Sequence, residues 1–98
     1  NYDDAIEDIN KAIKLYPDFA YSYYNRAGLY AISGKYPEAF EDYTKAIELH
    51  PNFGEAYYNR GLTLLFLGEK ELAINDLSKA GELGIKEAYA VIKRFINN

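Results

Sequence analysis

The stretch AYSYYNRAGLYAISGKYPEAFEDYTKAIELHPNF, residues 20–53, decides the fold of this chain. Its pattern recurs at a fixed distance, since residues 57–61 (YYNRG) repeat residues 23–27 (YYNRA) 34 positions later. In the other direction, residues 2–17 share their aromatic, alanine and proline positions with residues 36–51. A period of this length is typical of a stacked array of helical repeats. The sequence therefore predicts a binding scaffold, without naming what is bound.

Length and composition narrow the class further. The chain has 98 residues, a net charge of −4 and a pI of about 4.9. This mild acidity argues against a nucleic-acid or anionic-membrane partner, because both need clustered Lys and Arg. No apolar run approaches the roughly 20 residues of a membrane span, and the chain has no cysteine for disulfides or thiolate zinc sites. We expect a soluble protein, cytoplasmic by default.

Six helices are predicted from hydrophobic spacing and from end signals. Asp18 is expected to cap the second helix, and Asn52 with Glu55 is expected to form a capping box before the fourth. Pro37 suits the first turn of the third helix. Gly34 is expected to end the second helix in the left-handed conformation, and Gly68 and Gly84 are expected to end the fourth and fifth helices. The expected helices cover residues 3–15, 19–33, 37–49, 54–67, 70–82 and 86–96.

Small residues recur on both helices of each expected pair and would let these helices approach closely. They are Ala27 and Gly61 on the first helices, and Ala39, Ala46, Ala73 and Ala80 on the second. Large side chains are expected to fill the spaces between pairs. These are Tyr23, Tyr30, Phe40, Tyr43, Tyr57, Leu64, Ile74 and Leu77.

This arrangement resembles the tetratricopeptide repeat (TPR) pattern, which has an early aromatic residue, small residues at three set positions and a closing proline. The resemblance implies an all-α fold, a right-handed superhelical stack of antiparallel helix pairs with about six helices. It also implies that residues 1–98 form a single domain, which is a fragment of a longer array. This domain has four parts. These are the second helix of a truncated repeat (1–17), two full repeats (18–51 and 52–84) and a capping helix (85–98).

The chain departs from that pattern at three positions. Arg26 and Arg60 stand where the family often has leucine, and Ile85 replaces the last proline. Because Gly84 precedes Ile85, we expect the regular array to end there.

The resemblance also implies a concave face lined by the first helix of each pair. The inward positions are Tyr21, Tyr24, Asn25, Gly28, Ala31, Ile32, Glu55, Tyr58, Asn59, Leu62, Leu65 and Phe66, with Tyr89, Ile92 and Lys93 from the last helix. The two asparagines offer a donor and an acceptor each for the backbone of an extended peptide. The other interpretation is that the tyrosines pack sideways against neighbouring helices, with their hydroxyls in water.

One well-known subclass of the family binds the C-terminal carboxylates of chaperones through a clamp of lysines, arginine and asparagines. Only Asn25 matches that clamp here. Glu55 and Asn59 stand where it needs basic residues, so we expect no carboxylate clamp.

Arg26 and Arg60 are either ligand contacts or structural residues. Aspartates recur at the repeat period on the second helices, at positions 8, 42 and 76, which favours bidentate Arg–carboxylate pairs between adjacent helices. The lone histidine, His50, has no cysteine or second histidine to join it in a metal site. We expect no metal, cofactor or catalytic residue, and no enzymatic activity.

The expected function is that of a protein–protein interaction scaffold, which binds a peptide segment or a partner helix in its concave groove. The alternative is a structural spacer or self-association module with no separate ligand. Self-association is expected through the first helix, whose apolar residues Tyr2, Ile6, Ile9 and Ile13 lack an upstream helix to cover them.

Overall fold

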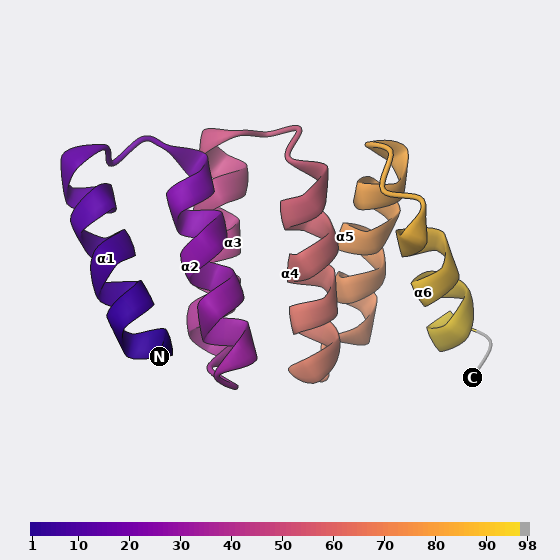
Figure 1. Ribbon diagram of the computed structural model, residues 1–98. Helices are drawn as coiled ribbons and strands as arrows, with labels where there is room; N and C mark the ends of the chain where they lie inside the picture. The colour runs from indigo at the N-terminus through magenta and orange to yellow at the C-terminus, as the bar shows by residue number, and fades with distance from the viewer. Residues whose placement is uncertain (97–98) are drawn as a thin grey trace.

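The chain forms a row of antiparallel helices (Figure 1). The structure, a computed structural model, describes residues 1–96, and its extents are 43 × 25 × 17 Å. The described residues contain helices and turns but no strand, which confirms the predicted all-α class. The helices are α1 (Tyr2–Leu15), α2 (Ala20–Ile32), α3 (Tyr36–Leu49), α4 (Gly54–Phe66), α5 (Lys70–Glu82) and α6 (Glu87–Ile96).

Glycines end three of the helices, as predicted, and all three are left-handed. Gly34 has φ 79°, Gly68 has φ 81° and Gly84 has φ 102°. At the first of these turns the N–H of Lys35 donates to the carbonyl of Tyr30 at 2.8 Å. Such bonds satisfy carbonyls that a helix end leaves unpaired, so each turn sends the chain back antiparallel to the helix before it.

The predicted side-chain caps of α2 and α4 are wrong. The residues at the N-cap positions are Phe19 and Phe53, and neither helix has a side-chain cap. Backbone bonds take their place, because the carbonyl of Phe53 accepts from the N–H of Ala56 at 3.1 Å. Phe53 itself is buried, so the start of α4 is held by packing. A side chain does cap α1, where Oδ1 of Asn1 accepts from the backbone N–H of Asp3 at 2.7 Å.

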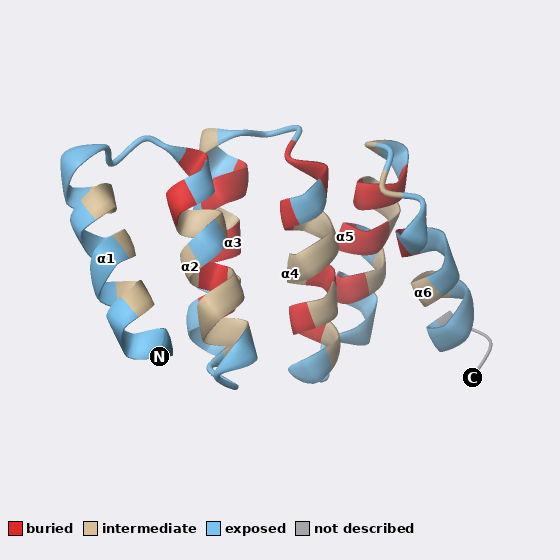
Figure 2. Cartoon of the chain, in the orientation of Figure 1, coloured by how far each residue is buried: buried red, intermediate tan, exposed pale blue. Residues whose placement is uncertain are grey.

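The predicted small residues lie where helices meet. The five alanines of that set have no exposed surface, and Gly61 is also buried. They belong to the same core clusters as large buried side chains such as Tyr43 and Leu77. Figure 2 shows the buried positions running through α2 to α5, whereas α1 has none. The core therefore lies between helices of successive pairs and thins out at α1.

Two arginines join the helices laterally. Arg26 donates through Nε and Nη2 to both carboxylate oxygens of Asp42, at 2.7 and 2.8 Å, and through Nη1 to Asn10 at 2.8 Å. Arg60 repeats this with Asp76, at 2.6 and 2.8 Å, and with Thr44 at 3.1 Å. Each guanidinium thus ties its own helix to the helix before it and to the helix after it.

These contacts confirm the predicted Arg–carboxylate pairs and the structural role of both arginines. Hydrogen bonding to Asp42 and Asp76 raises the pKa of Arg26 and Arg60, so both stay charged. Asp8 occupies the same register in α1 but is exposed. The arginine of each pair lies 16 residues before its aspartate, and position 8 has no such predecessor in this sequence.

Two glycines in equivalent helices provide a matched test of the packing. A Cβ at Gly61 would lie 2.8 Å from Cγ of Leu77, whereas a Cβ at Gly28 would meet no atom nearer than 3.9 Å. We expect Gly61→Ala to lower the free energy of unfolding by about 1–2 kcal/mol, because overpacking outweighs the gain in helix propensity. Gly28→Ala is expected to raise it by about 0.5–1 kcal/mol. Urea denaturation measures both, and equal effects would contradict the close approach at Gly61.

The arginine pair is tested by Arg60→Ala. This change leaves the nearly buried carboxylate of Asp76 without its cation, so we expect a loss of about 2–3 kcal/mol and a lower melting temperature. Lys45→Ala removes an exposed cation from α3 and is expected to change stability by less than about 0.5 kcal/mol. An unchanged melting temperature for Arg60→Ala, measured by circular dichroism, would contradict its structural role.

Candidate functional site

One face of the stack carries a continuous row of hollows, which we call the groove. At its α2–α4 end lies a hollow of about 410 Å³, the polar hollow, lined by Tyr24, Asn25, Gly28, Leu29, Ala31, Ile32, Tyr43 and Asn59. The adjoining hollow, of about 370 Å³, is lined by Ala31, Ile32, Tyr36, Tyr43, Asn59, Leu62, Thr63 and Phe66. Because the two share four residues, they form one depression.

The groove continues to α6. A hollow of about 380 Å³ is lined by Tyr58, Leu62, Glu87, Ala90, Val91, Arg94 and Phe95. Another of about 370 Å³, the apolar hollow, is lined by Leu62, Leu65, Phe66 and Phe95. Leu62 belongs to three of the four hollows, so the groove crosses α2, α4 and α6 without interruption.

Most of the sequence-predicted groove residues come together here. Those that line the groove are Tyr24, Asn25, Gly28, Ala31, Ile32, Tyr58, Asn59, Leu62, Leu65 and Phe66. Two other predicted residues lie outside these hollows. The Tyr21 ring packs 4.8 Å from that of Phe53, and Glu55 is exposed in the first turn of α4.

The predicted contribution of α6 is displaced. Instead of Tyr89, Ile92 and Lys93, this helix supplies Ala90, Val91, Arg94 and Phe95 to the groove. The Tyr89 ring covers Gly81 of α5, where an added Cβ would lie 2.5 Å from its Cζ. Lys93 is exposed and lines none of the four hollows.

The reason is the turn before α6. It is closed by left-handed Gly84, with the N–H of Ile85 donating to the carbonyl of Ala80 at 2.9 Å. As a result α6 begins at Glu87, one residue earlier than a strict 34-residue period from Gly54 would place it. Ala90, Val91 and Arg94 of α6 come 32 residues after Tyr58, Asn59 and Leu62 of α4, so the lining of α6 lies two residues earlier than the 34-residue period predicts. Two residues turn the face of a helix by about 200°, so the 34-residue alignment selects the wrong side of α6.

Two residues of α3 that the repeat pattern does not predict also reach the groove. Tyr43 of α3 lines two hollows, since Gly28 has no side chain to cover it. Tyr36 stacks on Phe66 with ring centroids 4.8 Å apart and an angle of 2° between the planes. Gly28, a glycine in mid-helix without a turn to make, was the signal that could have pointed to Tyr43.

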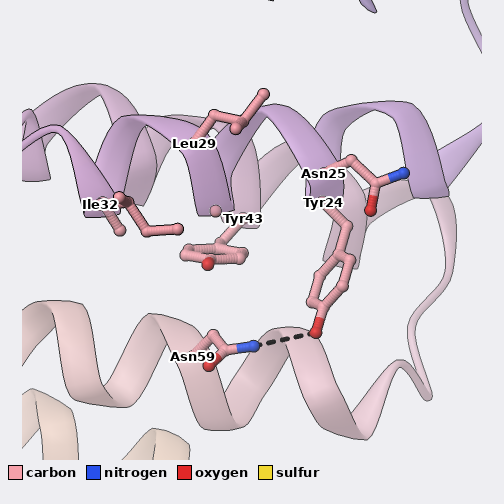
Figure 3. Close-up of a pocket in the computed structure, with 8 residues that line it drawn as sticks. Tyr24, Asn25, Leu29, Ile32, Tyr43 and Asn59 are labelled. Atoms are coloured by element: carbon pink, nitrogen blue, oxygen red, sulfur yellow. Dashed lines mark hydrogen bonds between the residues drawn. The ribbon is translucent and has the colours of Figure 1, made fainter. Parts of the chain in front are cut away.

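A hydrogen bond crosses the polar hollow. Nδ2 of Asn59 donates to the hydroxyl of Tyr24 at 2.9 Å, between α4 and α2 (Figure 3). Asn25, the other predicted polar contact, is exposed, and its side chain makes no hydrogen bond with another described residue. The two asparagines therefore differ, because one is already oriented by the fold and the other faces solvent.

The α2–α4 half of the groove is uncharged, since no ionisable acid or base other than tyrosine lines it. Burial raises the pKa of Tyr43 to about 12, and the neighbouring Tyr24 adds to the shift. Burial also raises the pKa of Tyr24, with a smaller contribution from the charge of Glu55. Both phenols therefore remain neutral hydrogen-bonding groups at physiological pH.

Among residues 1–96, neither a cluster of metal ligands nor a membrane-spanning helix is found. This part of the chain has no group of three His, Cys, Asp or Glu residues that could hold a metal ion. The His50 ring stacks on Phe53 with centroids 5.0 Å apart, which gives it a packing role. Within the same range, every helix is too short or too polar to cross a membrane.

Tyr43 gives the fold a defined dependence on alkaline pH. The unfolded phenol loses its proton near pH 10, whereas the folded one keeps it to about pH 12. Between these values the folded state holds more protons, so stability falls as pH rises. Tyr43→Phe removes this titrating group. We therefore expect the fall in the free energy of unfolding between about pH 9 and about pH 11 to be smaller in the variant by roughly 1–2 kcal/mol. Urea denaturation at both pH values checks this, and an unchanged decrease would contradict the assignment.

Comparison with known proteins places this helical-repeat protein in a family. Profiles described as tetratricopeptide repeat match residues 1–19, 20–53 and 42–75. The chain belongs to the tetratricopeptide repeat family, as its sequence pattern predicted. No curated protein sequence matches it significantly.

The solved structures that are similar to the chain include the following two. One is the first TPR of Spaghetti (RPAP3) bound to the HSP90 peptide SRMEEVD, with a TM-score of 0.93 and 28% identity; the match covers 98% of this chain and 78% of that one. The other is the MamA protein, with a TM-score of 0.87 and 29% identity, where the match covers 93% of this chain and 51% of MamA. This chain thus spans about half of MamA.

Proposed function

We propose that this chain binds an extended segment of another protein in the groove. The observation that carries the proposal is the unbroken run of hollows from α2 to α6, with large apolar side chains left open beside it. Ile32 is 65% exposed and Phe66 is 70% exposed. A contiguous apolar surface of this kind usually marks an interaction site.

The similarity to a peptide-bound TPR supports an interaction module, but the ligand of this groove differs in chemistry from SRMEEVD. That peptide carries three carboxylate side chains near its C-terminus. The hollows between α2 and α4 have no cation in their lining, and the chain as a whole is acidic. A carboxylate placed there would lose its hydration without gaining a partner. The α2–α4 half of the groove therefore favours a neutral, largely apolar segment, whereas Glu87 and Arg94 line the groove at α6.

Groove variants test the proposal on heptapeptides selected from a random phage-displayed library with this chain as bait. We expect Tyr58→Ala and Phe66→Ala each to weaken binding of the selected peptides by about tenfold or more, as loss of a large buried contact does. Isothermal titration calorimetry measures the affinities. Leu15→Ala is the matched control, because Leu15 is 73% exposed but lies on α1.

The peptide SRMEEVD serves as a second probe and is expected to give no saturable binding. Peptides that bind both groove variants as tightly as the unmodified chain would place the ligand elsewhere. Failure to select any peptide, together with a mass that grows with concentration in light scattering, would favour self-association instead. In that case the partly exposed Ile6, Ile9 and Ile13 of α1 are the first candidates for the contact.

A further inference from the structure

The polar hollow contains a hydroxyl that the fold does not use. Tyr43 is only 4% exposed, yet its hydroxyl makes no hydrogen bond with another described residue. No side-chain oxygen or nitrogen in the described chain is both fully buried and without a partner. The small exposed part of Tyr43 must therefore include the hydroxyl, which opens into the hollow beside the missing side chain of Gly28.

Three polar groups converge on this space (Figure 3). Asn59 donates through Nδ2 to Tyr24, which leaves Oδ1 of Asn59 as an acceptor. The Tyr24 hydroxyl accepts that bond and keeps its own proton for another acceptor. The Tyr43 hydroxyl offers a second donor. With the second N–H of the Asn59 amide, these three groups present one carbonyl acceptor and three donors, and the exposed amide of Asn25 also lines the hollow.

The walls around these groups are apolar and uncharged. Leu29, Ala31 and Ile32 provide aliphatic surface. A carboxylate would find two hydroxyls but no cation, and an ammonium group would find no carboxylate in the lining. A primary amide matches the set, because its carbonyl accepts from hydroxyls while its NH₂ donates to a carbonyl oxygen.

We propose that the polar hollow is an anchor subsite for a carboxamide side chain, glutamine or asparagine, of the bound segment. The hydroxyls of Tyr43 and Tyr24 donate to its carbonyl, and Oδ1 of Asn59 accepts from its NH₂. The aliphatic walls pack against the methylene groups of the side chain. This proposal rests on the proposed function and gives the ligand one specific residue.

The next repeat does not duplicate the anchor. One period later Leu62 replaces Gly28 and Leu77 replaces Tyr43. Leu77 is fully buried and fills the space beside Gly61, so α5 supplies no counterpart of the Tyr43 hydroxyl to the groove. The neighbouring apolar hollow has only Leu and Phe in its lining. A ligand is therefore expected to carry one amide residue, followed by an apolar residue toward α6.

The test uses the selected heptapeptides and Tyr43→Phe, which keeps the ring and removes only the hydroxyl. We expect the peptides to be enriched in Gln or Asn at one position and to bind Tyr43→Phe about threefold to tenfold more weakly, as loss of one neutral hydrogen bond does. Replacing that Gln by Glu in the peptide is expected to cost tenfold or more. Tyr30→Phe is the matched control, since Tyr30 packs against the core and lines no hollow described above.

A second variant does not depend on Tyr43. Gly28→Ala places a methyl group 3.9 Å from the hydroxyl, so it is expected to weaken the same peptides while the fold stays intact. Selected peptides without an amide preference, or equal binding to Tyr43→Phe, would contradict the carboxamide subsite but not the binding of peptides in the groove. Failure to select any peptide would overturn both.

Discussion

The close approach of helices at their small residues is the constraint on which the structure depends. At Ala27, Ala39, Ala46, Ala73 and Ala80 no side-chain surface remains exposed. Short helices are marginal in water unless they pack against one another, and a bulkier residue at these points would hold neighbouring helices apart. The tyrosines and leucines of the core can then interdigitate beside the small residues.

The arginine–aspartate pairs also constrain how neighbouring helices pack. Two parallel hydrogen bonds from a guanidinium to a carboxylate form only over a narrow range of orientations. Arg26 and Arg60 therefore fix the rotation of each first helix relative to its partner. Asn10 and Thr44 extend each pair to the preceding helix. Packing therefore sets the distance between helices, and these charged hydrogen bonds specify their orientation.

The groove is a consequence of that stacking. Successive first helices lie on one face, so the side chains that do not pack between helices face a common depression. The two halves of the groove differ because a few sequence changes between the repeats alter which side chains line it. Gly28 uncovers a tyrosine hydroxyl, whereas Leu62, Leu65 and Phe66 give an apolar surface.

The periodic sequence by itself determined much of this protein. The 34-residue repeat, the alanines and the glycine signals predict the class, the six helices and most of their ends, because each depends on local conformation or on contacts that recur in every repeat. The same periodicity predicts the Arg–Asp pairs and the α2 and α4 residues that line the groove, such as Asn59 and Phe66.

Only the tertiary structure decided the features that break the period. The turn at Gly84 changes the rotation of α6, so Arg94 and Phe95, not Lys93, line the groove. Backbone bonds and the burial of Phe53 replace the expected capping box. The Tyr43 hydroxyl reaches the groove from a helix expected to lie behind it, because access depends on which neighbour lacks a side chain, and a repeat pattern does not record that.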